Sequence, residues 1–394
     1  MEKLKSLKSY KIAGAAALAL TLGLTPISGL FPGSTPSAFA AESQKDNTKT
    51  SWDLELQNAP FKKNGVLFVP VKELSEYLDL HITLTSNKKY VYINSPLESV
   101  RIAPGQSKAV NAQGTTISLG AAPVVKKGVT YVPASLLTKS FGIPIKWNGK
   151  KTISLQGSKQ YVSSSINGMV FWLNRDNATL LTGQAGSVPR STGKVEIENI
   201  DWIGMKPRKI NASSYVVDIW NSHGEPHIHE TDVRVLLNKG KIVKQGTTHF
   251  SNFSGIRTNS NVNGFKGNVA IMDGSTLQLV HPTGKVVKTY DLEAITGVED
   301  DFVVEAIEND FLLVRPYIKS TLFIVHPTAK KSVLIYPELL DENAKKLIEE
   351  YPPNEMGYVG DALSYAGYKN QELTFTFNHP ILSSNSTFTY KLPF

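Results

Sequence analysis

The sequence predicts a mainly β protein, in which a small α+β module precedes a larger region of short strands. Residues 59–93 and 122–155 contain two similar runs of strand and helix patterns, offset by 63 residues. From residue 158 onward the helical patterns largely disappear, and one type of turn recurs about every 45 residues. The 394-residue chain has no cysteine, so its domains must be stabilised by hydrophobic cores and not by disulfides.

The first 40 residues have the three parts of a secretory signal peptide. Four of the first eleven residues are lysines, Ile12–Leu24 is an apolar run, and Ala38-Phe39-Ala40 offers small residues at a cleavage site. The apolar run is shorter than the ~20 residues that span a bilayer as a helix. We therefore expect cleavage after Ala40 and a secreted, extracellular chain, with an uncleaved membrane anchor as the alternative. We predict no membrane-spanning segment after cleavage, and residues 41–51 should form a linker.

Each copy of the repeated unit begins with an alternating strand, at residues 66–69 or 129–132. A proline follows each strand, at Pro70 and Pro133, where we expect it to end the ladder and enter the first turn of a helix. Leu74, Tyr77 and Leu78 would share one face of the first helix. Two strands joined by a lysine-containing turn would complete each copy, and a hairpin over residues 100–120 would connect the copies.

A sequence motif in the second copy points to a known family. The series reads Gly128-Val129-Thr130-Tyr131-Val132-Pro133, then Phe141-Gly142-Ile143 and Ile145-Lys146-Trp147. Through it, residues 52–156 resemble the stalk domain family named after the amino-terminal domain of copper amine oxidases. The resemblance implies an exported α+β spacer or interaction module. It does not imply oxidase activity, because copper and the tyrosine-derived quinone of those enzymes belong to a separate catalytic domain, and no copper amine oxidase catalytic motif is present here.

Residues 158–394 are predicted to form a five-bladed β-propeller, with a β-sandwich as the alternative. Similar turns lie at residues 191–195, 238–242, 282–286 and 327–331, and their third residues are 47, 44 and 45 positions apart. A period near 45 with several short strands is typical of propeller blades. One helical segment, Leu339–Tyr351, would interrupt the blades, and the end of the chain would form a last hairpin.

Three of the eight histidines lie within seven residues, at His223, His227 and His229. In a strand, His227 and His229 would point to the same face, where two imidazoles can hold one divalent metal ion. His223 could supply a third ligand, with Glu225 or Glu230 nearby. The spacing matches no closed zinc signature, so a polar loop between two strands is the competing interpretation. No other cofactor is predicted.

Two further histidines and an acidic run have structural interpretations. His281 and His326 each precede a similar turn, and we expect each ring to bond the backbone of that turn. The run Glu299-Asp300-Asp301 lacks the spaced oxygen ligands of a calcium loop, which favours a solvated turn.

No sequence pattern supports catalysis. The chain has no Gly-x-Ser-x-Gly elbow, no phosphate-binding glycine loop and no His-Glu-x-x-His helix. A propeller glycosidase could use carboxylates such as Asp201, Asp218 and Glu305, yet no motif separates them from ordinary polar residues. An extracellular polysaccharide hydrolase therefore stays an alternative and not the main prediction.

The charge pattern excludes one class of partner. The formal net charge is +8, but four of the lysines belong to the signal segment, and no basic cluster interleaved with aromatic residues predicts nucleic-acid binding. We predict a secreted or cell-wall-associated, non-catalytic binding protein. Its partner would be a cell-wall polymer, a glycan or a protein ligand, held by loops at one rim of the propeller.

Overall fold

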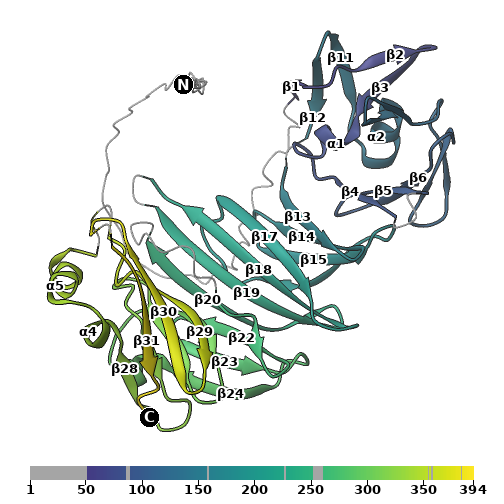
Figure 1. Cartoon of the computed structure of the whole chain (residues 1–394). Helices are drawn as coiled ribbons and strands as arrows, with labels where there is room; N and C mark the ends of the chain where they lie inside the picture. The colour runs from purple at the N-terminus through teal and green to yellow at the C-terminus, as the bar shows by residue number, and fades with distance from the viewer. Residues whose placement is uncertain are drawn as a thin grey trace, which may run out of the picture. The chain divides into compact units, whose positions relative to one another are not determined.

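The structure is a computed structural model that describes residues 51–85, 89–157, 159–225, 228–251, 261–353, 355, 358–382 and 384–394. Within these residues the chain is mainly β, as predicted, and is built from many small antiparallel sheets (Figure 1). The predicted signal peptide and its cleavage site lie outside the described residues, as does the predicted linker except for Ser51, which begins the first strand. None of the described helices is long and apolar enough to cross a bilayer.

Three sheets and two helices form the N-terminal domain. The strand orders are β1-β12-β11, β2-β3-β10-β9 and β4-β5-β6-β7-β8. The strands are β1 (Ser51–Glu55), β2 (Phe61–Lys63), β3 (Val66–Pro70), β4 (His81–Leu84), β5 (Val91–Asn94), β6 (Ser99–Ile102), β7 (Lys108–Asn111), β8 (Thr116–Ser118), β9 (Val124–Lys126), β10 (Val129–Pro133), β11 (Ile145–Gly149) and β12 (Thr152–Gln156). The helices are α1 (Val71–Leu74) and α2 (Ala134–Phe141). Strands β3 and β10 pair at the centre of the second sheet, and each leads directly into a helix.

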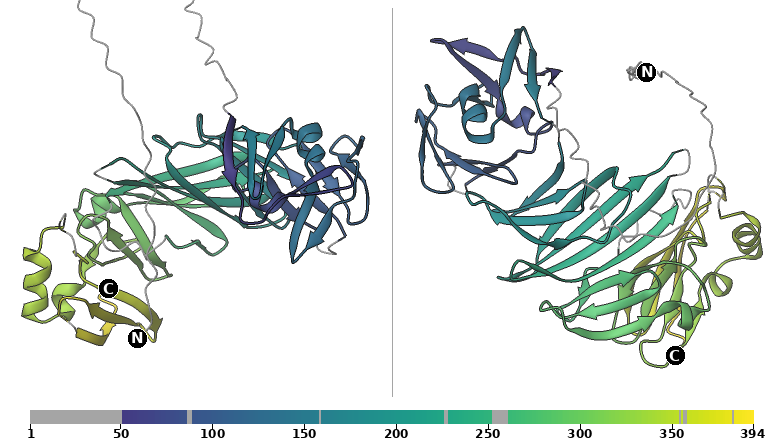
Figure 2. Two further views of the ribbon diagram at one scale, coloured as in Figure 1. Left: turned by 90° about the horizontal axis from the view of Figure 1, so that it is seen from above. Right: turned by 180° about the vertical axis from the view of Figure 1, so that it is seen from behind.

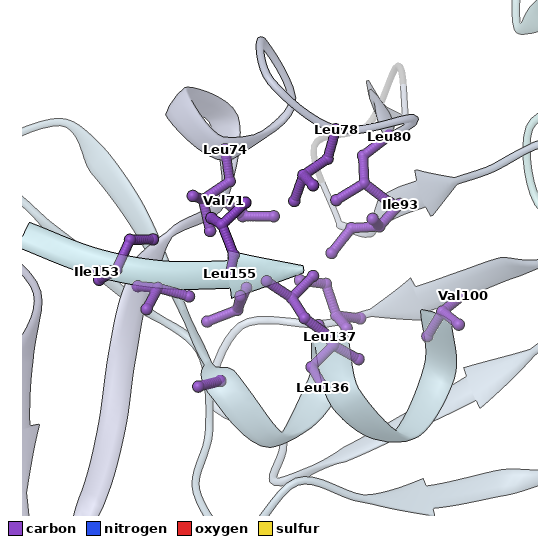
Figure 3. Close-up of a cluster of buried hydrophobic side chains, with 14 of the residues drawn as sticks. Val71, Leu74, Leu78, Leu80, Ile93, Val100, Leu136, Leu137, Ile153 and Leu155 are labelled. Atoms are coloured by element: carbon purple, nitrogen blue, oxygen red, sulfur yellow. The ribbon is translucent and has the colours of Figure 1, made fainter. Parts of the chain in front are cut away.

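The two helices of this domain share one hydrophobic core. Val71 and Leu74 of α1 and Leu136 and Leu137 of α2 are each at most 1% exposed, and they lie beside Leu155 of β12 (Figure 3). Burial of one such side chain contributes about 1.5–3 kcal/mol. The apolar face of each short helix therefore stabilises the domain without any disulfide.

The starts and ends of these helices differ in part from the prediction. Pro70 and Pro133 are the last residues of β3 and β10, where they pair across the sheet, and they precede the helices instead of entering them. Helix α1 ends at Leu74, so Tyr77 and Leu78, which the sequence places on its face, lie beyond it. The Leu78 N–H still donates to the Leu74 carbonyl, so Leu78 is buried while Tyr77 is 39% exposed. Helix α2 ends at Gly142, whose φ of +65° is the left-handed conformation that glycine favours.

Five sheets follow one another through the C-terminal region, and each is an antiparallel meander of consecutive strands (Figures 1 and 2). The first has β13 (Tyr161–Ile166), β14 (Met169–Asn174), β15 (Thr179–Gln184) and β16 (Arg190–Lys194). The second has β17 (Trp202–Lys209), β18 (Ser214–His223), β19 (His229–Asn238) and β20 (Lys241–Ser251). The third has β21 (Gly264–Phe265), β22 (Asn268–Asp273), β23 (Thr276–Val280) and β24 (Val286–Asp291), followed by α3 (Leu292–Thr296). The fourth has β25 (Phe302–Ile307), β26 (Leu312–Pro316), β27 (Phe323–Val325) and β28 (Ser332–Leu334), and the fifth has β29 (Leu363–Lys369), β30 (Glu372–His379) and β31 (Ser384–Lys391).

Buried apolar clusters join each of these sheets to the next one along the chain. Phe171 of the first sheet meets Tyr215 of the second, with ring centroids 5.6 Å apart. Val216 of the second sheet is buried with Ile271 of the third. Further clusters join the third sheet to the fourth and the fourth to the fifth. Among the described residues these clusters link consecutive sheets only.

Three of the four similar turns connect neighbouring strands as predicted, and the fourth prediction is wrong. The turns at 238–242, 282–286 and 327–331 join β19 to β20, β23 to β24 and β27 to β28. Residues 190–194, by contrast, form β16. Gly193 has a φ of +144° within that strand, and a Cβ there would lie 3.0 Å from the side chain of Ile242. Close approach of another strand, and not a turn, therefore explains this glycine.

The helical segment predicted between the strands consists of two separate helices. They are α4 (Tyr336–Leu339) and α5 (Glu342–Glu350), where the sequence predicts one helix over 339–351. Leu340 is extended, and the side chain of Asp341 caps α5 by accepting a hydrogen bond from the Ala344 N–H at 2.9 Å. An aspartate cap starts a new helix, which separates α5 from α4.

Candidate functional site

An open cavity of about 1230 Å³ lies in the C-terminal region. It is lined by the β16–β17 connection, the facing ends of β18 and β19, the end of β20 and segments of the third and fourth sheets. The lining residues are Lys194, Val195, Glu196, Ile197, Glu198, Asn199, His223, His229, Glu230, Thr231, Thr247, His249, Phe250, Asp273, Asp300, Tyr317, Ile318 and Pro353. Loops carried by successive sheets thus meet at one place, as expected for a site on a rigid β scaffold.

Strand β20 holds the walls of this cavity together. It is the edge strand of the second sheet, so its outer side is free to bond other segments. The Thr247 hydroxyl donates to the Glu196 carbonyl at 3.2 Å, and the Thr247 N–H donates to Asp273 Oδ1 at 3.2 Å. Two residues further on, the His249 N–H donates to Asp301 Oδ2 at 2.5 Å. One strand therefore fixes segments from the first, third and fourth sheets.

Negative groups outnumber positive ones around the cavity. Five carboxylates and one lysine line it, namely Glu196, Glu198, Glu230, Asp273, Asp300 and Lys194. Glu230 is only 5% exposed and accepts a hydrogen bond from the Ser222 hydroxyl at 2.6 Å, whereas Glu196, Glu198 and Asp273 are exposed. The cavity therefore favours a ligand that carries positive charge.

The structure places two of the three clustered histidines in this cavity. His223 ends β18 and His229 begins β19, and the two are opposite each other across the hairpin. Their rings are stacked with centroids 5.5 Å apart. His227 lies outside the described residues. No group of three His, Cys, Asp or Glu side chains within the described part of the chain could hold a metal ion, so the metal site stays a prediction.

An aromatic pair forms part of the cavity wall. The rings of Phe250 and Tyr317 are parallel within 1°, with centroids 4.4 Å apart. Burial raises the pKa of Tyr317, and the negative charge of Asp232 raises it further. Tyr317 is therefore a neutral, apolar wall at physiological pH, and the sequence pattern did not indicate it.

The acidic run at 299–301 forms hydrogen bonds to a second loop of the fourth sheet, whereas the sequence favours a solvated turn. Asp300 accepts hydrogen bonds from the Ile318 N–H at 2.7 Å and the Asp301 N–H at 2.8 Å, and the Tyr317 N–H donates to the Asp301 carbonyl. Burial raises the pKa of Asp300 from 3.8 to about 6 in spite of these bonds. The run ties one loop of the fourth sheet to another beside the cavity.

Replacing Asp300 by asparagine should change how stability depends on pH. Because the folded pKa of about 6 lies above the unfolded value of 3.8, the stability that protonated Asp300 contributes is complete below about pH 3.8 and is lost as the pH rises through 6. The melting temperature of Asp300→Asn relative to wild type should therefore rise between pH 4 and pH 7. Solvent contact limits the change to about 1 kcal/mol. A difference that stays constant with pH, measured by calorimetry, would show that the pKa is not raised.

The turn histidines behave as predicted. The Thr283 N–H donates to His281 Nδ1 at 3.3 Å, and the Thr328 N–H donates to His326 Nδ1 at 3.1 Å. The Ala329 N–H also donates to His326 Nδ1, at 3.0 Å. Both rings therefore shape their turns, which confirms the structural interpretation.

The three carboxylates considered for glycoside hydrolysis do not line the cavity. Asp218 pairs with Arg234 at 2.6 Å, and Glu305 pairs with the buried Arg315 at 2.5 Å. Asp201 borders a separate hollow beside Trp202. None of the cavities described here is lined by all three carboxylates.

Comparison with known proteins bears mainly on the N-terminal domain. Residues 48–155 match the family model described as copper amine oxidase N-terminal domain, which agrees with the resemblance predicted for residues 52–156. The match covers about a quarter of the chain. No curated protein matches the chain.

Solved structures resemble the chain only distantly. The WD40 domain of SCAP from fission yeast is 11% identical with a TM-score of 0.26, and the match covers 82% of this chain and 69% of that one. AztD from Citrobacter koseri is 12% identical with a TM-score of 0.23, over 80% of this chain and 83% of that one. The AfRom2 CNH domain is 7% identical with a TM-score of 0.21, over 81% and 95%. These scores are too low to assign the fold of the C-terminal region.

Proposed function

The N-terminal domain matches the copper amine oxidase N-terminal family. From this match and the sequence patterns, we propose that the chain is an exported, cell-wall-associated and non-catalytic binding protein. The N-terminal domain would be a stalk-like spacer, and the five-sheet region would present the ligand site. Export rests on the lysine-rich start, the apolar run and the small residues before Ala41. Sequencing the amino terminus of protein from the culture medium should begin at Ala41, and a start at Met1 would count against cleavage.

Two finer features of the fold belong to this proposal. We propose that residues 59–93 and 122–155 are copies of one unit, supported by a hairpin, a helix and a second hairpin in each. We also propose that the five consecutive sheets are propeller blades, supported by the buried clusters that join each sheet to the next. A crystal structure would test ring closure, because a closed propeller needs β29–β31 packed against β13–β16.

The acidic cavity is the observation that carries the binding function. It is large enough for several sugar or amino-acid units, since ligand pockets typically occupy about 300–1,000 Å³. Its carboxylates favour a cationic group, and the parallel rings of Phe250 and Tyr317 supply an apolar wall. A binding role is favoured over hydrolysis because Asp218 and Glu305 are already paired with arginines. Asp300 likewise accepts two backbone hydrogen bonds.

Titration calorimetry with matched sugars tests this function. A glucosamine hexamer at pH 6, with most of its amines protonated, should bind more tightly than the N-acetylglucosamine hexamer. Glu196→Gln/Glu198→Gln removes two exposed carboxylates of the cavity and should weaken binding roughly tenfold, which corresponds to ~1.4 kcal/mol. Glu372→Gln, at an exposed position of the fifth sheet, is the control and should leave the affinity unchanged.

The same purified protein can be used to test two alternative functions, hydrolysis and metal binding. Equal affinity for the charged and acetylated hexamers, or no binding of either, would contradict the proposal. Release of shorter sugars would instead favour a hydrolase. Metal analysis, with His227→Ala/His229→Ala as the comparison, tests the predicted divalent metal site at His223, His227 and His229.

A further inference from the structure

A second surface with its own chemistry lies on the second sheet, and none of its residues lines the acidic cavity. Strand β17 is an edge strand of that sheet, and alternate residues along it share one face. Ile203 and Met205 point into the core against the first sheet. The opposite face therefore carries Trp202, Gly204, Lys206 and Arg208, which are the other members of the alternation.

Two tryptophans on this face are exposed. Trp202 is 78% exposed and Trp220 is 46% exposed. Gly204 lies opposite Trp220 in the β17–β18 ladder, and the indole lies flat against it, because a Cβ at Gly204 would be 2.3 Å from Trp220 Cζ2. One side of the Trp220 ring is thus held by the glycine backbone. Large exposed aromatic surfaces on a rigid sheet mark an interaction site.

Positive charge follows the tryptophans along the same strand. Lys206 is exposed, and the Nη2 atom of Arg208 is buried without a hydrogen-bond partner in the described part of the chain. Asp218 lies opposite Lys206, but its carboxylate already accepts a hydrogen bond from Arg234 Nε at 2.6 Å. Asp232 lies opposite Trp220 and lines the same hollow, where three basic side chains (Lys206, Arg208 and Arg234) outnumber two carboxylates (Asp218 and Asp232).

The tryptophans and the cations form one strip. Trp220 borders two neighbouring hollows, one of about 470 Å³ with Trp202 and one of about 500 Å³ with Lys206 and Arg208. Six residues separate Trp202 from Arg208, which corresponds to about 20 Å along a strand. This length suits several consecutive units of a linear polymer better than a single small molecule.

We propose that this strip binds an acidic polysaccharide of the uronate type. The flat indoles of Trp202 and Trp220 would stack on the C–H faces of sugar rings, and Lys206 and Arg208 would pair with ring carboxylates. A uronate fits because each unit carries both a C–H face and a carboxylate, so that neighbouring units can meet a tryptophan and a cation in succession. The site lies outside the acidic cavity and would attach the protein to a polyanionic matrix.

Matched sugars again give the sharpest test. A β-1,4-linked glucuronate octamer and the cellulose octamer have the same backbone and differ in the C6 carboxylate. The full chain without its signal segment should bind the glucuronate octamer more tightly, and added salt should weaken that binding. Trp202→Ala and Trp220→Ala should each lower the affinity roughly tenfold or more, in the range of interface residues that dominate binding.

Further variants distinguish the contributions of the positive charges, the position of the Trp220 ring and the acidic cavity to glucuronate binding. Lys206→Gln/Arg208→Gln should reduce both the affinity and its salt dependence, whereas Lys241→Gln, at an exposed turn of the same sheet, should change neither. Gly204→Ala keeps both indoles but displaces Trp220, and it should also weaken binding. The cavity variant Glu196→Gln/Glu198→Gln should bind the glucuronate octamer as wild type does, so this proposal and the cavity proposal can fail independently.

Three results would overturn the proposal. They are no binding of the glucuronate octamer, unchanged affinity in Trp202→Ala, and equal affinity for the cellulose octamer. Tighter binding of polyaspartate or duplex DNA than of the glucuronate octamer would also overturn it, since neither needs a sugar-stacking strip. Trp202 is largely exposed, so its alanine variant should fold normally, and circular dichroism can confirm this.

Discussion

Replacing Arg315 by methionine is expected to lower the free energy of unfolding of the fourth and fifth sheets by about 3–5 kcal/mol. Arg315 is 3% exposed and lies between two carboxylates, with Nε 2.5 Å from Glu305 Oε1 and Nη1 2.6 Å from Asp361 Oδ1. Burial alone would lower its pKa, but the charges of Asp361 and Glu305 outweigh burial and raise it. Removing the cation leaves two carboxylates in a dry environment without compensation.

The same arginine ties two sheets together. Arg315 belongs to β26, and its Nη2 donates to the Leu363 carbonyl at the start of β29, at 2.7 Å. Asp361 in turn accepts hydrogen bonds from the Leu322 N–H at 2.6 Å and the Leu363 N–H at 3.1 Å. The substitution should therefore loosen the fifth sheet as well as the fourth.

Hydrogen exchange and calorimetry are the suitable measurements. All five tryptophans precede residue 221, so tryptophan fluorescence would not report on these sheets. Faster exchange should appear in β25–β30 of Arg315→Met. Lys346→Met is the control, because Lys346 and Glu350 are exposed and 3.9 Å apart, and it should change stability by less than about 0.5 kcal/mol. A similarly small effect of Arg315→Met would contradict the importance of the network.

Replacing Trp172 by alanine should destabilise the first sheet by about 3–5 kcal/mol. Trp172 lies in the central part of β14 and is 1% exposed. It forms T-shaped contacts with the rings of His81 and Tyr161, whose centroids are 6.1 and 6.4 Å away. Loss of the indole removes a large buried surface and leaves a cavity that the surrounding strands can fill only in part.

The effect should reach the N-terminal domain. His81 of β4 contacts the Trp172 ring, and its Nδ1 lies 3.2 Å from the Ser163 hydroxyl of β13. Asp79 also accepts hydrogen bonds from the Gln160 and Tyr161 N–H groups. Hydrogen exchange should therefore speed up in β4 as well as in β13–β15 of Trp172→Ala.

A second tryptophan provides the matched control. Trp202→Ala removes the same side chain from a position that is 78% exposed, so stability should change by less than about 0.5 kcal/mol. Equal destabilisation by the two substitutions would contradict the burial of Trp172. The comparison also shows that loss of glycan binding in Trp202→Ala is not a loss of folding.

Local patterns in the sequence predicted many elements well. Alternation at residues 66–69 and 129–132 predicted β3 and β10. The repeated histidine turns were predicted because His281 and His326 act on residues only two or three positions away. Interactions over such short distances along the chain leave a clear pattern in one sequence.

The functional surfaces could be predicted only in part, because their residues are far apart in the chain. The histidine cluster drew attention to this hairpin, and two of its members, His223 and His229, do line the cavity. Nothing in the sequence brought Glu196, Asp273 and Asp300 to the same cavity, since each belongs to a different segment held by β20. The sequence also misplaced β16 as a turn, because Gly193 serves a contact with Ile242 about fifty residues away.

The sequence by itself determined the mainly β class, the N-terminal domain with its family resemblance, and the absence of cysteine, because composition and periodicity carry these properties directly. The tertiary structure alone decided which charges are paired and which are open to a ligand. Asp218 and Glu305 look like any other carboxylates in the sequence, but folding pairs both of them with arginines and leaves Glu196 and Glu198 exposed at the cavity. Pairing depends on the register of strands and the packing of sheets, and those contacts join residues that no local pattern connects.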